Sequence, residues 1–293
     1  MFQFFANMFG YLLQILYTIV NNYGLAIILF TVIIKLLLLP LSIKQQRTMK
    51  KSAELQEKVK VIQFKYKSDP EKMNQEMMNL YKNEKMSPFS GCLTAIIQMI
   101  LLLSIFYLVR SPLTFMEKIP QENINNYISQ LKEDGKTVSS AYPEIDIIRE
   151  FDWLKEKNPE DSQIEKIDIK MNFLGLDLSK IPQQNMTDYT VYIIPVLYIL
   201  SSFISIKMTT AMQEKQKKEI KESKIDGTTG KELEEQTNEM DAVMQTNKMM
   251  SWMMPIMSIS IAFVAPLGLA LYWLISNILM IIERLILNKV IKT

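Results

Sequence analysis

The chain has 293 residues, a formal net charge of +2, and a composition that is 48% hydrophobic. It contains no histidine and a single cysteine, Cys92, which excludes an internal disulfide, the usual zinc ligand sets and any mechanism that needs a histidine base. The apolar residues gather into long runs, and a run of about 18 or more can cross the roughly 30 Å hydrocarbon core of a bilayer as a helix. The sequence therefore predicts an all-α multi-pass membrane protein.

Residues 1–22 are apolar, but polar residues interrupt them at helical spacing. The polar positions are Gln3, Asn7, Gln14, Thr18 and Asn21. They form one stripe on a helix of 3.6 residues per turn, which favours an interfacial amphipathic helix outside the membrane over an additional span. The segment lacks the positive start and the cleavage pattern of a secretory signal, so we expect none here.

Five later runs predict transmembrane helices. They cover residues 23–43, 89–110, 188–208, 249–265 and 266–287. The last two belong to one apolar block that is too long for a single span. The block is broken at Pro266-Leu267-Gly268, where proline and glycine two residues apart favour a turn.

Segment 44–88 predicts a cytoplasmic helical hairpin. Apolar side chains recur at helical spacing in each half, at Leu55, Val59, Ile62 and Tyr66 and then at Met73, Met77, Leu80 and Tyr81. Asp69-Pro70 between the halves is a helix start signal. The pattern predicts two amphipathic helices packed on each other; a further hypothesis is that their lysine-rich faces meet anionic lipid, ribosomal RNA or a nascent chain.

The charges beside the spans predict the orientation. Segment 44–88 carries eleven Lys/Arg against six Asp/Glu, and segment 111–187 carries nine against fourteen. Positive flanks stay inside, so we expect the N-terminus and an extracellular region at 111–187 outside, and the C-terminus inside. Residues 209–248 then form a polar cytoplasmic loop, and 288–293 a cytoplasmic tail.

Lys35 is the charged residue of the first predicted span and lies near its middle. A charge at that depth costs about 2.5–3.5 kcal/mol on insertion scales. Snorkelling, an intramembrane salt bridge, a neutral lysine or a water-filled pocket between helices would each offset this cost. The other predicted spans have no acidic residue near their middle, since Asp188 and Glu283 are at edges, so the sequence favours the wet pocket.

Polar and aromatic residues on other predicted spans are candidates to line the same pocket. Together with Lys35, the predicted groove residues are Gln98, Ser205, Tyr272, Trp273 and Asn277. Each of them alone is more often a helix–helix contact. No catalytic residue, cofactor or metal site is predicted, and no glycine-rich phosphate loop is present.

The motifs resemble those of the YidC membrane protein insertase family. The matching segments are Tyr23–Ile28 with Lys35 and Leu39–Leu41, then Leu80–Lys82, Ser87-Pro88, Gly91–Leu93 and Gln98-Met99, and finally Met253–Ile256 and Pro266–Trp273 with Asn277. Their order and spacing hold from about residue 20 to residue 287.

This resemblance implies a five-span core in a bacterial plasma membrane, with a hydrophilic groove that faces the cytoplasm. It implies insertion of nascent membrane proteins into the lipid bilayer, alone or with the ribosome and the Sec translocon, and no DNA partner. The family has an arginine where Lys35 stands; both are cations, but lysine lacks the planar fork. The resemblance is to members without the large periplasmic domain.

The main alternative is an ion or solute transporter that uses Lys35 as an intramembrane coupling charge. Transporters of that kind usually carry inverted repeats, and the sequence shows none.

Overall fold

The computed structural model describes residues 2–84, 90–222 and 260–290. The elements are α1 (Phe2–Val20), α2 (Tyr23–Lys65), α3 (Pro70–Asn83), α4 (Ser90–Arg110), α5 (Pro112–Phe115), α6 (Gln121–Glu133), α7 (Pro143–Arg149), α8 (Phe151–Lys157), η1 (Ile164–Ile167), β1 (Asn172–Phe173), β2 (Leu176–Asp177), η2 (Pro182–Gln184), η3 (Tyr189–Tyr192), α9 (Ile193–Glu222) and α12 (Leu267–Val290). The predicted all-α class is confirmed, with one two-stranded antiparallel hairpin as an addition.

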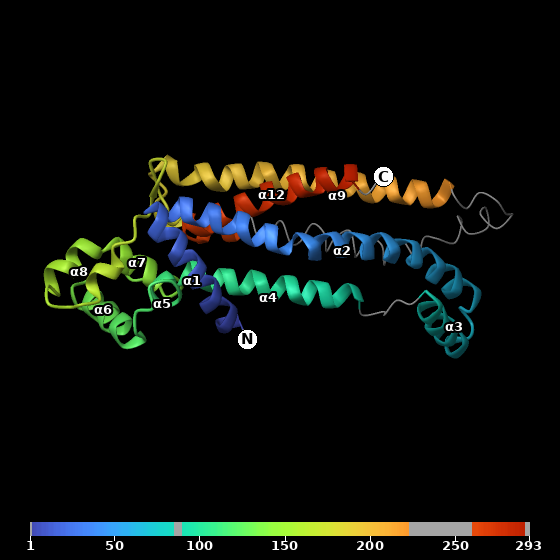
Figure 1. Cartoon of the computed structure of the whole chain (residues 1–293), viewed down its shortest axis with the longest axis horizontal. Coiled ribbons are helices and arrows are strands. Elements are labelled where there is room, and N and C mark those ends of the chain that lie inside the picture. The colour runs from blue at the N-terminus through green and yellow to red at the C-terminus, as the bar shows by residue number, and fades with distance from the viewer. Residues whose placement is uncertain (1, 85–89, 223–259, 291–293) are drawn as a thin grey trace.

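Long helices lying side by side form the body of the molecule. Figure 1 shows α2, α4, α9 and α12 along the long axis, with α5–α8 at one end and α3 at the other. We call these the capped end and the hairpin end. Segments of α1, α2 and α12, and the η3–α9 segment, are long and apolar enough to cross a membrane within the described ranges, so the chain is a multi-pass membrane protein.

Helix α2 is a continuous helix of 43 residues, about 65 Å long at 1.5 Å per residue. Its apolar part is Tyr23–Gln45, and a lysine-rich part follows without a break, through Pro40 and on to Lys65. The predicted division at residues 43 and 44 is therefore a change of surface chemistry and not a helix end.

Helix α3 folds back along the second half of α2. It begins at Pro70, as predicted, because the Asp69 side chain accepts a hydrogen bond of 3.0 Å from the backbone N–H of Lys72 and so caps the helix. Near its other end, Glu84 pairs with Lys58 and its carbonyl oxygen accepts from Lys51 Nζ at 3.1 Å. These contacts hold the two arms antiparallel.

Helix α1 runs obliquely to α2 and α4 and packs against both (Figure 1). One face is buried, through Ala6, Phe9, Gly10, Leu13 and Leu16. A second face is apolar and exposed, through Phe4, Met8, Tyr11, Ile15 and Ile19. The predicted polar stripe lies between these two faces. By length and composition α1 could also span a membrane, so the interfacial position stays a prediction.

The 111–187 region folds into a small helical unit whose core is continuous with that of the long helices. Buried side chains include Tyr127, Leu131, Ile147 and Leu154. Buried Glu144 ties α7 to α5, because its carboxylate accepts from the backbone N–H of Thr114 at 3.0 Å and from the Thr114 hydroxyl at 2.6 Å.

This unit caps the starts of two long helices. The Tyr23 N–H donates to Lys170 O at 3.0 Å, and the N–H groups of Leu267 and Gly268 donate to Lys180 O and Leu178 O at 2.9 Å. These are amides that a helix leaves unpaired at its N-terminus. Residues 260–264 are helical and α12 starts at Leu267, so a helix break lies at Pro266.

The structure describes only part of the predicted loop at 209–248, the predicted span at 249–265 and the predicted tail at 288–293. Helix α9 continues past residue 208 to Glu222, so the predicted loop at 209–248 starts as helix. The rest of that loop and most of the predicted span 249–265 lie outside the described residues, as do residues 291–293 of the predicted tail.

Replacing Gly10 with alanine should destabilise the packing of α1. A Cβ at residue 10 would sit 1.8 Å from the backbone oxygen of Phe115 in α5, so a helix must shift. We expect the free energy of unfolding to fall by about 1–3 kcal/mol, seen as a lower melting temperature of the purified protein in detergent. Gly268→Ala is the matched control, because its nearest neighbour would lie at 3.5 Å. Equal melting temperatures for the two variants would contradict this packing.

Candidate functional site

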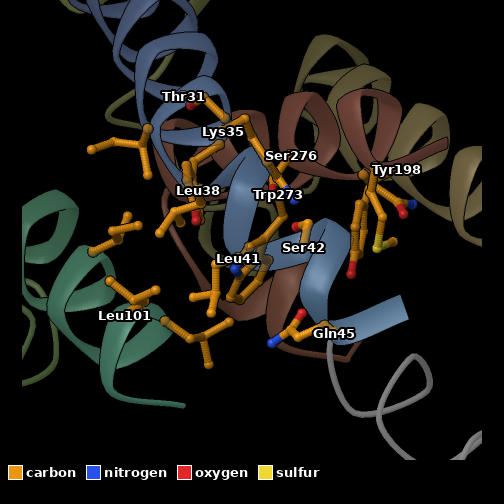
Figure 2. A pocket seen from close by; sticks show the side chains of 16 residues that line it. Thr31, Lys35, Leu38, Leu41, Ser42, Gln45, Leu101, Tyr198, Trp273 and Ser276 are labelled. Carbon is orange, nitrogen blue, oxygen red and sulfur yellow. The ribbon is translucent and has the colours of Figure 1, made fainter. Parts of the chain in front are cut away.

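A cavity of about 180 Å³ lies between α2, α4, α9 and α12, which is room for several water molecules. Figure 2 shows its lining, with Lys35 among the side chains that α2 contributes. The lining residues are Thr31, Ile34, Lys35, Leu38, Leu41, Ser42, Gln45, Leu101, Leu102, Ile105, Tyr198, Tyr272, Trp273, Ser276, Asn277 and Met280. Half the surroundings are thus polar or aromatic groups inside an otherwise apolar bundle.

The cavity follows α2 from the middle of its apolar part toward the hairpin end. Its α2 lining begins at Thr31 and ends at Gln45, about 21 Å of helix rise. Gln45 is also the last residue of the apolar part. The cavity lining therefore connects the middle of the apolar part of α2 with the beginning of its lysine-rich part.

No carboxylate of the described residues binds Lys35. Within the described ranges its ammonium takes part in no hydrogen bond or ion pair, and the charged side chains that act on it through space are Glu283 and Arg284. About 15 Å of helix rise separates residue 35 from Gln45, which is more than a lysine stem spans, so the cavity is the available place to hydrate the charge.

A line of polar contacts joins α9 to α12 beside the cavity. Asn277 Nδ2 donates to Ser201 Oγ at 3.0 Å and to Ser202 Oγ at 3.2 Å. Farther toward the hairpin end, Arg284 Nη1 donates to Ser205 Oγ at 3.4 Å and to Thr209 Oγ1. Interhelical bonds of this kind hold spans together where apolar packing alone gives little selectivity.

The structure brings together four of the predicted groove residues. Lys35, Tyr272, Trp273 and Asn277 all line the cavity. Ser205 does not, because it faces the α9–α12 contact and accepts from Arg284. Gln98 lies in α4, but its side chain is outside the described residues.

Several lining residues were missed from the sequence, although a signal for them exists. Thr31, Ser42 and Gln45 lie 4, 7 and 10 residues from Lys35, which are spacings that place them on the same face of a helix. Arg284 carries the same kind of signal, because it lies seven residues after Asn277 on the same face of α12. In the described ranges no group of three Asp, Glu or Cys side chains could hold a metal ion.

Comparison with known proteins assigns the chain to a family. The model of the 60Kd inner membrane protein family matches residues 15–293. The chain belongs to this family. Among its relatives, a protein of Treponema denticola is 27% identical over 96% of the chain, and one of Chlorobaculum parvum is 29% identical over 93%. A protein of Caldanaerobacter subterraneus is 44% identical over 36% of the chain.

All three relatives are named membrane protein insertase YidC. The chain spans 37%, 34% and 52% of the lengths of the Treponema, Chlorobaculum and Caldanaerobacter proteins, respectively. The family match over residues 15–293 includes every helix that lines the cavity, so the family resemblance seen in the motifs covers the site.

Cysteine labelling can test whether the cavity holds water. Leu38 lines the cavity, whereas its neighbour Leu37 is 69% exposed on the outer surface of the bundle. Maleimides react with the thiolate, which forms in water and not in hydrocarbon. In a Cys92→Ser background and in liposomes, we expect Leu38→Cys to react several times faster than Leu37→Cys with a water-soluble maleimide. Equal rates would show that the cavity is dry.

Proposed function

We propose that the chain is a membrane protein insertase, which moves nascent membrane proteins from the cytoplasm into the bilayer. The cavity around Lys35 serves as a hydrophilic groove, and no nucleotide is hydrolysed. The observation that carries the proposal is Lys35 itself, a cation deep in an apolar span that lines a cavity and binds no carboxylate within the described residues.

The groove reduces the largest cost of insertion. A single-span protein must bring its polar outer tail through hydrocarbon, where each unpaired backbone or charged group costs several kcal/mol. A polar path from Gln45 to Thr31 covers about 21 Å of helix rise, which is most of the roughly 30 Å hydrocarbon core. Only in the remaining part of the hydrocarbon core does the tail lack polar neighbours.

Lys35 gives the path its preference for acidic tails. A cation without its own counter-ion attracts a carboxylate from the arriving chain, and releases it again because water competes for both charges. Lysine is a compact and strongly hydrated charge, so the pairing is transient. Tyr272, Trp273 and Asn277 supply the facing wall.

The driving force comes from the substrate and the membrane. Transfer of the apolar segment into lipid is favourable at about 25 cal/mol per Å². A membrane potential that is negative inside contributes about 2.3 kcal/mol per carboxylate for each 100 mV as the tail moves outward. These two terms replace nucleotide hydrolysis.

The proposal includes an orientation and partners. The hairpin end, with α3 and the lysine-rich half of α2, lies in the cytoplasm, and the 111–187 region lies outside, as the positive-inside rule favours. The N-terminus is then outside and the C-terminus inside. The hairpin is the surface on which ribosomes would meet the chain, and the Sec translocon is a further partner.

Substitution of Lys35 tests the charge role. Lys35→Ala should lower the rate at which an acidic-tailed substrate is inserted by roughly tenfold, equivalent to about 1.4 kcal/mol, whereas Lys35→Arg should retain most of the rate. The measurement is protection of the tail from added protease in proteoliposomes that contain the purified chain. Full and equal activity in both variants would remove the charge role, and a wild-type rate no higher than that of empty liposomes would refute the insertase function.

A further inference from the structure

Arg284 is a second cation beside the cavity, and it too binds no carboxylate of the described residues. Its side chain is half-buried between α12 and α9, where Nη1 contacts the hydroxyls of Ser205 and Thr209. Within the described residues the guanidinium forms no ion pair, and Glu283 acts on it only through space. Two hydroxyls hold the side chain in place but leave its charge uncompensated.

The guanidinium also keeps hydrogen-bond donors to spare. An arginine has five N–H donors in a fixed fork, and the contacts to Ser205 and Thr209 use Nη1 alone. The edge formed by Nε and Nη2 has no hydrogen-bond partner in the described part of the chain. That edge has the geometry that grips a carboxylate with two parallel bonds.

The position of Arg284 continues the line of the cavity. On α12 the lining includes Trp273, Asn277 and Met280, and Arg284 follows Met280 by one further turn on the same face. The direction along α12 is from the capped end to the hairpin end (Figure 1). Arg284 therefore lies where the polar path meets the hairpin end, about 10 Å of helix rise from Asn277.

We propose that Arg284 is a second binding position for carboxylates of the arriving segment, nearer the hairpin end than Lys35. This inference rests on the proposed insertase function and extends it to a sequence of two positions. An acidic tail binds first to the fork of Arg284, held ready by the α9 hydroxyls, and then moves to the ammonium of Lys35. The two cations act on each other through space, so a carboxylate that arrives between them relieves their repulsion.

Arg284 could instead serve only to hold α9 and α12 together, and three variants distinguish this structural role from carboxylate binding. Arg284→Gln removes the charge but keeps an amide donor for Ser205 and Thr209. Arg284→Lys keeps the charge and loses the fork. Lys207→Gln is the matched control, because Lys207 is an exposed cation of α9 between Ser205 and Thr209 that lies on the opposite side of the helix.

The experiment measures insertion of one single-span substrate in two forms by the purified full chain in proteoliposomes. One form has an acidic tail, and the other has the same tail with Asn and Gln in place of Asp and Glu. We expect Arg284→Gln to slow the acidic form roughly fivefold and to leave the neutral form unchanged. Arg284→Lys should retain more of the rate than Arg284→Gln, and Lys207→Gln should match the wild type on both forms.

Two results would overturn the second position. One is an unchanged rate of Arg284→Gln on the acidic form while Lys35→Ala still slows it, which leaves the insertase function intact. The other is an equal loss on acidic and neutral forms, which assigns Arg284 to the α9–α12 contact or to lipid headgroups. A wild-type chain that inserts neither form faster than empty liposomes would overturn this inference together with the proposed function.

Discussion

The deepest cation of the bundle constrains the rest of the structure, because no carboxylate among the described residues neutralises it. Lys35 stands in the middle of the apolar part of α2, where an ammonium in hydrocarbon costs several kcal/mol. Around Lys35 the bundle provides a cavity of about 180 Å³, which is lined by hydroxyl groups from α2 and α12 and by the amide of Asn277. A buried carboxylate would have satisfied the lysine permanently, and a permanent ion pair has little attraction left for an outside anion.

The two ends of the bundle differ in structure and in charge. At the capped end, carbonyl groups of the 111–187 region bind the first amides of α2 and α12, so backbone and side chains of a folded unit close the bundle there. Toward the hairpin end the cavity lining continues to Gln45, and α2 then runs on as a lysine-rich helix. A polar lining that is continuous with a charged surface at one end of the bundle gives the bundle a direction, and the one-way insertion route that we propose requires that asymmetry.

The sequence predicts the features that depend on local patterns and misses those that depend on distant partners. Apolar runs, the break before Leu267 and the Asp69 cap follow from composition and capping chemistry. The fold of 111–187 depends on contacts such as Glu144 with Thr114, which are 30 residues apart, and no short pattern encodes them. Ser205 was expected to line the groove because its span is right, but which face of α9 meets α12 is decided by packing, and that packing turns Ser205 toward Arg284.

The chemistry of the two cations suits their depths. Deep in the bundle, the ammonium of Lys35 is compact and can be hydrated by a few water molecules in a small cavity. Nearer the hairpin end, hydroxyls of Ser205 and Thr209 occupy one nitrogen of Arg284 and fix its plane, which lowers the entropy cost of presenting the remaining donors. In the proposed route, a shallow fork would select carboxylates and a deep charge would hold them weakly, which would divide recognition from release so that neither step has to be strong enough to trap the substrate.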